Sequence, residues 1–310
     1  MPTPSEGRTG SKERDGRKGD RHLALATFVT CSVLAVQSAE PLRVSALARA
    51  VRPGELVVLE IAGAEPGASV HVRAFDRDIP AYTTTEGTHR ALVGIDLDVK
   101  PGTYAAAIDA GGAHAAYDLV VAKRAFRTRT LTVDPAFVTP PESERERIER
   151  DAKLLEEVWR SSSPERLWRE RFVRPVAEAA NSAFGTRSIF NGQPRSAHGG
   201  ADFLSPAGTA IHAPNAGRIV VARELYFSGN TIVIDHGLGV FSMLAHLSAF
   251  DVREGDRVAA GQLVGRVGAT GRVTGPHLHC KHGTPPGAPV SAKKRRIWTW
   301  YSTCHSSSRL

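Results

Sequence analysis

Two short segments carry the residue types that hold a catalytic metal ion. The first contains His198 and Asp202, four residues apart, and the second contains His277 and His279, separated by one residue. A β-strand places residues i and i+2 on the same face, so the two histidines of the second segment are expected to point the same way. Two imidazoles and a carboxylate suit a catalytic zinc ion that keeps its fourth position for water. Each pair alone is a weak signal, but the two pairs together indicate a zinc site.

Three motifs, in a fixed order, contain these pairs and one further histidine. They are His-Gly-Gly-Ala-Asp at 198–202, Ala-His-Leu-Ser at 245–248 and Gly-Pro-His-Leu-His at 275–279. With the glycine-rich β pattern between them, they resemble the zinc endopeptidases of the lysostaphin/LytM type, which cut peptides in bacterial cell walls. The resemblance runs from about residue 184 to residue 279 and implies that peptidoglycan peptides are the substrate.

The resemblance also implies a role for each residue of the site. His198, Asp202 and His279 are expected to bind one Zn²⁺ ion, and His246 and His277 are expected to be the catalytic histidines. Zinc lowers the pKa of its bound water, and a neighbouring imidazole can accept the water's proton and later donate one to the leaving amine. The other imidazole can stabilise the developing oxyanion. The sequence leaves open which histidine does which.

Other residues near these motifs are weaker candidates. Asn191 precedes the first motif and could line a substrate-binding groove. Gly199 and Gly200 are expected to let the backbone bend tightly beside the metal. Cys280 follows the second histidine pair and should point to the opposite face of the strand, which argues against it as a ligand. His236 lies in a predicted turn and is expected to have no role in the site.

Composition and charge favour a β protein and weigh against a nucleic-acid partner. The chain has 310 residues, 41% of them hydrophobic, with 29 Gly and 19 Pro, which is typical of β structure with many turns. The net charge of +8 comes from the ends, because residues 1–22 carry six basic and four acidic side chains and residues 281–310 carry six basic and none acidic. The body is neutral, whereas a surface that binds phosphates should be basic.

Residues 1–39 are expected to hold a disordered, charged N-terminal region followed by a secretory signal peptide. Four basic or imidazole side chains come before an apolar run of 14 residues, 23–36, which small residues follow. The run is too short to span a membrane comfortably. We therefore expect export across the inner membrane to the periplasm or cell envelope, with no integral span beyond this signal. A monomer is favoured.

The rest of the chain is expected to hold two β domains and a helical linker. Short strands separated by Pro-Gly and Gly-Gly turns predict an immunoglobulin-like antiparallel sandwich over 40–135. Residues 184–280 are expected to form the antiparallel β metallopeptidase domain of the lysostaphin/LytM type. The fold class is thus mainly β, with a helical linker over 140–182.

Within this linker, apolar residues at helical spacing predict a helix over 143–160. Ser143 and Glu146 have the spacing of a capping box, in which each side chain bonds the other residue's backbone N–H. A second short helix is expected to begin at Pro164 and to carry Leu167 and Trp168.

After His279 the sequence departs from the family's pattern. A proline-rich stretch, 285–289, and a basic, aromatic end replace the strand that usually follows, so residues 281–310 are expected to be a disordered tail. His279 would then lie near a frayed sheet edge. This feature alone favours the alternative function, a noncatalytic scaffold or activator of cell-wall hydrolases. Because all five key residues are present, a zinc metallo-endopeptidase is the leading hypothesis, and a structural zinc module, which is usually Cys-rich, is a third.

Overall fold

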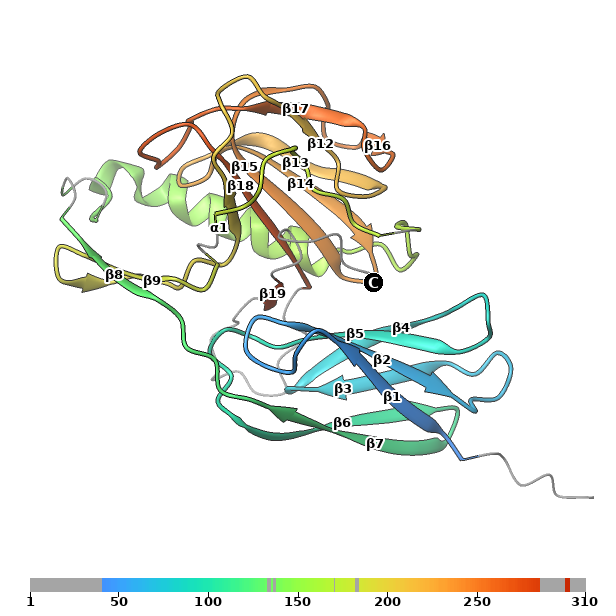
Figure 1. The fold of residues 1–310 in the computed structure, drawn as a ribbon. Coiled ribbons are helices and arrows are strands. Elements are labelled where there is room, and N and C mark those ends of the chain that lie inside the picture. The colour runs from blue at the N-terminus through green and yellow to red at the C-terminus, as the bar shows by residue number, and fades with distance from the viewer. Residues whose placement is uncertain are drawn as a thin grey trace, which may run out of the picture. The chain divides into compact units, whose positions relative to one another are not determined.

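The computed structural model describes residues 41–132, 135, 138–169, 171–181, 184–284 and 299–301. The expected signal, residues 1–39, lies outside these ranges, as does most of the tail. Strands dominate the described part, so the mainly β fold class is confirmed (Figure 1). Among the helices described, none has the length and apolar content that a membrane crossing requires.

The N-terminal β domain has seven antiparallel strands in the order β1-β2-β5-β4-β3-β6-β7. Side chains alternate between inside and outside along them, as β3 shows, where Val70, Val72 and Ala74 are buried and the residues between them are exposed. Residues from β2, β3, β5, β6 and β7 share one hydrophobic core. The predicted antiparallel β domain is present, whereas its immunoglobulin-like relationship stays a prediction. The strands are β1 (Arg43–Ala48), β2 (Leu56–Ala62), β3 (Val70–Ala74), β4 (Arg77–Thr83), β5 (His89–Gly94), β6 (Gly102–Ala110) and β7 (Ala113–Val121).

Helix α1 (Arg145–Arg160) confirms the predicted linker helix and lies against the second β domain. Its Trp159 is 4% exposed and meets Phe241 edge-to-face, with the ring centroids 5.0 Å apart. The predicted capping box of Ser143 and Glu146 is wrong. A short 3₁₀ turn, Glu142–Glu144, precedes the helix, and the N-cap Glu144 makes no side-chain capping bond. The helix therefore depends on packing of its apolar face rather than on a cap.

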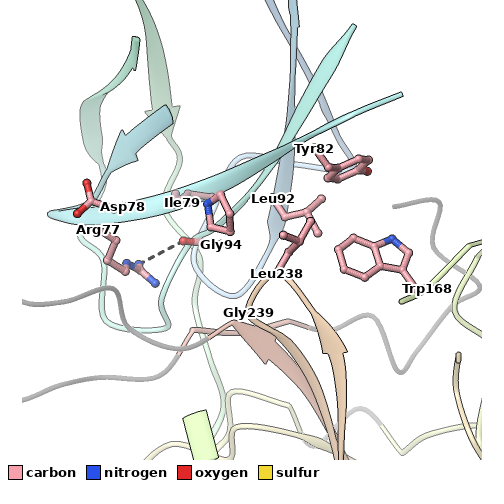
Figure 2. A pocket seen from close by; sticks show the side chains of 10 residues that line it. Arg77, Asp78, Ile79, Tyr82, Leu92, Gly94, Trp168, Leu238 and Gly239 are labelled. Atoms are coloured by element: carbon pink, nitrogen blue, oxygen red, sulfur yellow. Dashed lines mark hydrogen bonds between the residues drawn. The ribbon is translucent and has the colours of Figure 1, made fainter. Parts of the chain in front are cut away.

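The predicted second short helix is also wrong, because the described residues from Pro164 onward form no helix. The chain here is irregular because Trp168 is packed away from water against other elements. Its ring, only 1% exposed, meets Tyr82 of β4 edge-to-face at 5.7 Å. Trp168 and Tyr82 line a largely apolar pocket together with Leu92 and Leu238 (Figure 2). Tertiary burial has overridden the local helical pattern.

The second β domain is built on one large antiparallel sheet in the order β11-β18-β15-β14-β13-β16, which β12, β17 and β19 extend. A smaller sheet, β10-β9-β8, joins a strand that follows the first domain, β8, in parallel to β9 near the start of the second domain. The strands are β8 (Thr128–Leu131), β9 (Arg187–Phe190), β10 (Gln193–Pro194), β11 (Ala201–Phe203), β12 (Ala210–His212), β13 (Gly217–Leu225), β14 (Gly229–Gly237), β15 (Val240–Phe250), β16 (Arg257–Val258), β17 (Leu263–Val267), β18 (Leu278–Thr284) and β19 (Thr299–Tyr301).

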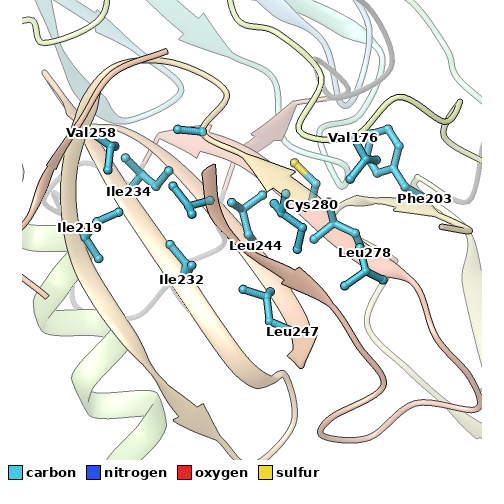
Figure 3. Close-up of a cluster of buried hydrophobic side chains, with 14 of the residues drawn as sticks. Val176, Phe203, Ile219, Ile232, Ile234, Leu244, Leu247, Val258, Leu278 and Cys280 are labelled. Carbon is cyan, nitrogen blue, oxygen red and sulfur yellow. The ribbon is translucent and has the colours of Figure 1, made fainter. Parts of the chain in front are cut away.

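The core of this domain lies on one face of the large sheet (Figure 3). Ile219, Ile232, Leu244 and Leu278 are fully buried there, and Cys280 packs among them. The predicted direction of Cys280, opposite to the histidine pair, is confirmed. Helix α1 packs on the other face of the same strands, so the central strands are covered on both sides.

The expectation that His279 lies near a frayed edge is wrong. Strand β18 lies between β11 and β15, so that His279 has Asp202 as its cross-strand partner on one side and Ala245 on the other. The strand also continues past residue 280 to Thr284, because the residues before the proline-rich stretch can still donate ladder hydrogen bonds. The metal-site strand is therefore among the best-supported strands of the sheet.

Candidate metal centre

Three of the predicted ligands converge on one point. The Oδ1 atom of Asp202 lies 2.8 Å from Nδ1 of His279 and 3.1 Å from Nε2 of His198. The two imidazole nitrogens lie 3.1 Å apart. The described residues hold no other group of three or more His, Cys, Asp or Glu side chains placed to bind a metal ion.

The spacing of these three atoms fits a tetrahedral zinc ion. Zinc binds imidazole nitrogen at about 2.0–2.1 Å, which places two ligands of a tetrahedral site roughly 3.3 Å apart. The observed separations of 2.8–3.1 Å are slightly shorter than this value. Three electron-rich atoms packed so closely are well matched to a shared cation, and a small outward movement would give the ideal distances.

Strand pairing explains why predicted ligands 77 residues apart meet. Asp202 lies on β11 and His279 on β18, directly opposite each other in the antiparallel register. His198 precedes β11, and its backbone N–H donates to the carbonyl of Thr186 at 2.9 Å. His277 lies on the same side as His279, with its Nε2 3.9 Å from Oδ1 of Asp202. The predicted shared face of the histidine pair is therefore confirmed.

The protonation states also suit a metal site. Burial by itself would raise the pKa of Asp202, but hydrogen bonds and charges from His198 and His279 outweigh it and hold that pKa far below its ordinary value. Burial lowers the pKa of His279 to about 3, and hydrogen bonding to Asp202 offsets only part of this effect. At neutral pH the site thus presents a carboxylate and a neutral imidazole, the forms that bind metal.

His246 reaches the site through an irregularity in β15. Its φ of 68° is in the left-handed region, which is uncommon for a non-glycine residue. The register between β14 and β15 shifts here, since Ile232 pairs with Leu244 but Asn230 pairs with Leu247. The extra residue re-aims the side chain, as β-bulges near active sites do. The ring of His246 comes to lie 4.8 Å from that of His277 and 6.0 Å from that of His279.

Backbone carbonyls fix the tautomer of both predicted catalytic histidines. Nδ1 of His246 lies 2.9 Å from the carbonyl oxygen of Thr270, and Nδ1 of His277 lies 2.9 Å from that of Gly275. A carbonyl oxygen only accepts, so each Nδ1 must carry the proton and each Nε2 presents a lone pair. Burial lowers the pKa of His246 to about 4, which keeps this imidazole neutral. Both rings can therefore accept a proton at Nε2.

Thr270 is a residue that sequence reasoning missed. Its hydroxyl donates to the carbonyl of Leu247 at 2.8 Å and accepts from the N–H of Asn230 at 2.9 Å. Gly229 lies against it so closely that a Cβ there would be 2.3 Å from the Thr270 carbonyl carbon. These contacts hold the carbonyl that orients His246. Thr270 lies within the stretch that resembles the lysostaphin/LytM family, but nothing in the local sequence indicates this contact.

The glycines beside the first predicted ligand combine a bend with close packing. The backbone bends at Gly200, as expected, although neither Gly199 nor Gly200 has a positive φ. Gly200 is also required for space: a Cβ there would lie 2.6 Å from Nε2 of His279 and 2.6 Å from the carbonyl oxygen of Cys280. The missing side chain lets β11 approach the back of the His279 ring.

Two other candidates fall outside the cluster. Asn191 and Gly192 have φ values of 48° and 80° and form the turn between β9 and β10, as an Asn-Gly pair favours. The role of Asn191 in substrate binding stays a prediction. His236 is fully buried, 2.8 Å from the carbonyl of Ala216 and 2.7 Å from the hydroxyl of Ser242, so it serves the core rather than the site.

The site region is similar to known cell-wall peptidases. The sequence profile of Peptidase family M23 matches residues 196–291. Peptidoglycan DD-endopeptidase ShyA of Vibrio cholerae is 42% identical over 100 residues, which are 32% of this chain and 23% of that protein. Glycyl-glycine endopeptidase ALE-1 of Staphylococcus capitis is 44% identical over 89 residues, 28% of this chain and 25% of that protein. The chain thus spans about a quarter of these relatives.

A solved structure extends the similarity over most of the chain. A crystal structure from Pseudomonas aeruginosa, described as a peptidase M23, aligns with a TM-score of 0.61 and 30% sequence identity. The alignment covers 74% of this chain and 89% of that one. With the metal-ligand geometry and the family profile, this similarity shows that the chain belongs to peptidase family M23.

Proposed function

We propose that this protein is a zinc-dependent endopeptidase that hydrolyses peptide cross-links of bacterial peptidoglycan. The observation that carries the proposal is the convergence of His198, Asp202 and His279, with His246 and His277 beside them. Relatives named as peptidoglycan and glycyl-glycine endopeptidases support the substrate class.

The residues of the site supply binding, orientation and proton transfer. His198, Asp202 and His279 would hold one Zn²⁺ ion, which when bound lowers the pKa of a water and polarises the scissile carbonyl. The Nε2 lone pair of His246 or His277 accepts the proton of the attacking water, and the same ring then donates a proton to the leaving amine. The partner imidazole, after taking up a proton from solvent at Nε2, stabilises the negative charge on the carbonyl oxygen.

The same geometry favours an enzyme over a noncatalytic scaffold. A scaffold has no need of the strained backbone at His246, whose φ of 68° brings the ring to the metal ligands. Strain of this kind persists where the surrounding structure enforces it, and it is common at active sites. Since peptidoglycan lies outside the cytoplasm, we propose that the protein acts in the periplasm or cell envelope, after export directed by residues 1–39.

The direct test is the metal dependence of cleavage. Purified cross-linked muropeptides are incubated with the full-length protein as prepared, after chelation, and after zinc is added back, and the products are separated by chromatography. We expect cleavage that chelation abolishes and zinc restores. A zinc-loaded protein that cleaves no cross-linked muropeptide would overturn the proposal.

A further inference from the structure

Three side chains of metal-ligating types lie in one row across the N-terminal β domain, outside the catalytic centre. His71 lies on β3, Asp109 on β6 and His114 on β7, and these three strands are neighbours in the sheet (Figure 1). The antiparallel register pairs His71 directly with Asp109, and Asp109 directly with His114. The backbone therefore places a carboxylate between two imidazoles.

The three side chains share the solvent face of the sheet. Val70 and Val72, on either side of His71, are buried in the hydrophobic core, so His71 points to the opposite face. Asp109 likewise lies between two buried residues of β6, and His114 is exposed. Directly opposed residues of neighbouring strands have Cβ atoms about 4.5–5.5 Å apart. Side chains at this separation can reach a common ion above the middle strand.

Two members of the row already make the contact that is seen between predicted ligands of the catalytic centre. Nδ1 of His114 lies 3.1 Å from Oδ2 of Asp109. The same distance, 3.1 Å, separates Nε2 of His198 from Oδ1 of Asp202. A surface hydrogen bond has this length as well, so the third member of the row decides between an ordinary pair and a metal site.

His71 must turn to complete the site. Its Nε2 lies 3.0 Å from the hydroxyl oxygen of Ser69, so the three ligating groups are not gathered around one point. Exposed side chains change rotamer in picoseconds to nanoseconds, and a hydrogen bond to an exposed hydroxyl is readily exchanged for one to water. Because Asp109 is the direct cross-strand partner of His71, the turned ring has only one strand spacing to bridge.

The ligand set indicates the class of ion. Imidazole suits zinc, copper and nickel, whereas calcium and magnesium take oxygen ligands. The side chains of His114 and Asp109 are 72% and 49% exposed, against 11% and 19% for His279 and Asp202 of the catalytic centre. Water therefore fills the remaining coordination positions, and the ion should bind more weakly here than at the catalytic centre.

We propose that His71, Asp109 and His114 form a second metal site, for a divalent transition-metal ion of the zinc type. The site goes beyond the proposed endopeptidase function and does not depend on it. The bound ion joins β3, β6 and β7 through one ligand from each strand. Because binding is weak, this ion is lost on desalting and returns when zinc is added.

The test is a zinc titration of the full-length protein without a histidine tag. The protein is loaded with zinc and desalted, and further zinc is then added in a calorimeter. The variants are His71→Ala, Asp109→Asn and His114→Ala, with circular dichroism to confirm folding. Asp118→Asn is the matched control, because Asp118 is an exposed carboxylate on the same face of β7 whose cross-strand partner is Ala105.

The wild type and Asp118→Asn should bind one further zinc ion with equal affinity. Each of the three variants in the row should bind it at least roughly 10-fold more weakly, since even the loss of a group that only supports a ligand costs 10- to 100-fold. A wild type that binds no further ion would overturn the site. So would unchanged affinity in any one of the three variants, because all three ligands are part of the proposal.

The same titration in His279→Ala separates this site from the proposed function. His279 is a predicted ligand of the catalytic centre, so its loss removes metal binding there. Whether or not the protein is a peptidase, His279→Ala should bind the second ion like the wild type, and His114→Ala added to it should abolish this binding. If the ion is lost in His279→Ala alone, it belongs to the catalytic centre and the second site is refuted.

Discussion

Gly200→Ala should weaken zinc binding, because the added methyl group would displace the imidazole of the predicted ligand His279. The added Cβ would lie 2.6 Å from Nε2 of His279 and 2.6 Å from the backbone oxygen of Cys280, whereas ordinary contact begins at 3.4 Å. Relief therefore requires a movement of about 0.8 Å, which is 3.4 Å less 2.6 Å. Because the Cys280 oxygen is backbone in the sheet, both the Gly200 backbone and the imidazole of His279 must shift to relieve the clash.

That movement is large for a metal site. Ligand distances in metal sites hold to within about 0.2 Å, and lesser disturbances around ligands typically cost 10- to 100-fold in affinity. We expect Gly200→Ala to weaken zinc binding by at least roughly 10-fold. Overpacking should also lower the stability of the zinc-free protein by about 1–3 kcal/mol.

The assay is zinc competition against a chelator of known affinity, with circular dichroism to confirm folding. Gly275→Ala is the matched control, since Gly275 also adjoins a site histidine but a Cβ there would meet nothing within 4 Å. The control should bind zinc like the wild type. If folded Gly200→Ala binds zinc as tightly as Gly275→Ala, the argument that this glycine makes room for His279 is refuted.

Three further predictions concern the contact that orients His246, the packing of helix α1 and the buried His236. Thr270→Val removes the hydroxyl that bonds Asn230 and Leu247, so kcat should fall while zinc content is retained. Thr270→Ser keeps the hydroxyl and should keep activity. Equal kcat in the two variants would contradict this role. Trp159→Ala, which opens a cavity between α1 and the sheet, should cost about 3–5 kcal/mol in urea unfolding, and a loss under 1 kcal/mol would refute that packing. Burial lowers the pKa of His236 from 6.5 to about 3. On acidification this imidazole therefore takes up a proton in the unfolded chain at a higher pH than in the folded protein. Stability should then fall by up to about 1.4 kcal/mol per pH unit below 6.5, and a flat unfolding free energy from pH 6.5 to 4.5 would exclude this linkage.

The resemblance to the lysostaphin/LytM family gave the ligand set, and local periodicity predicted only how the residues of the second segment point. Residues two apart in a strand share a face, which places His277 with His279 and turns Cys280 into the core. The mainly β character and helix α1 likewise follow from patterns within a few residues.

The supports of the site could not be predicted, because they depend on contacts between distant segments. The left-handed backbone of His246 results from a register shift between β14 and β15, which no local pattern encodes. The clearance at Gly200 depends on a ring 79 positions further along the chain. The frayed edge at His279 was wrongly expected for the same reason, the dependence on distant segments. The prolines after residue 284 do not determine which strands flank β18.

The most direct test of the central claim compares zinc content and cross-link cleavage in His279→Ala and His246→Ala. His279 is a predicted ligand, while the ring of His246 lies beside the ligands at 6.0 Å from that of His279. The wild type should hold about one zinc ion per chain and cleave purified cross-linked muropeptides. His279→Ala should lose both properties, whereas His246→Ala should keep zinc and lose cleavage. Full zinc content in His279→Ala, or undiminished cleavage by His246→Ala, would contradict the account.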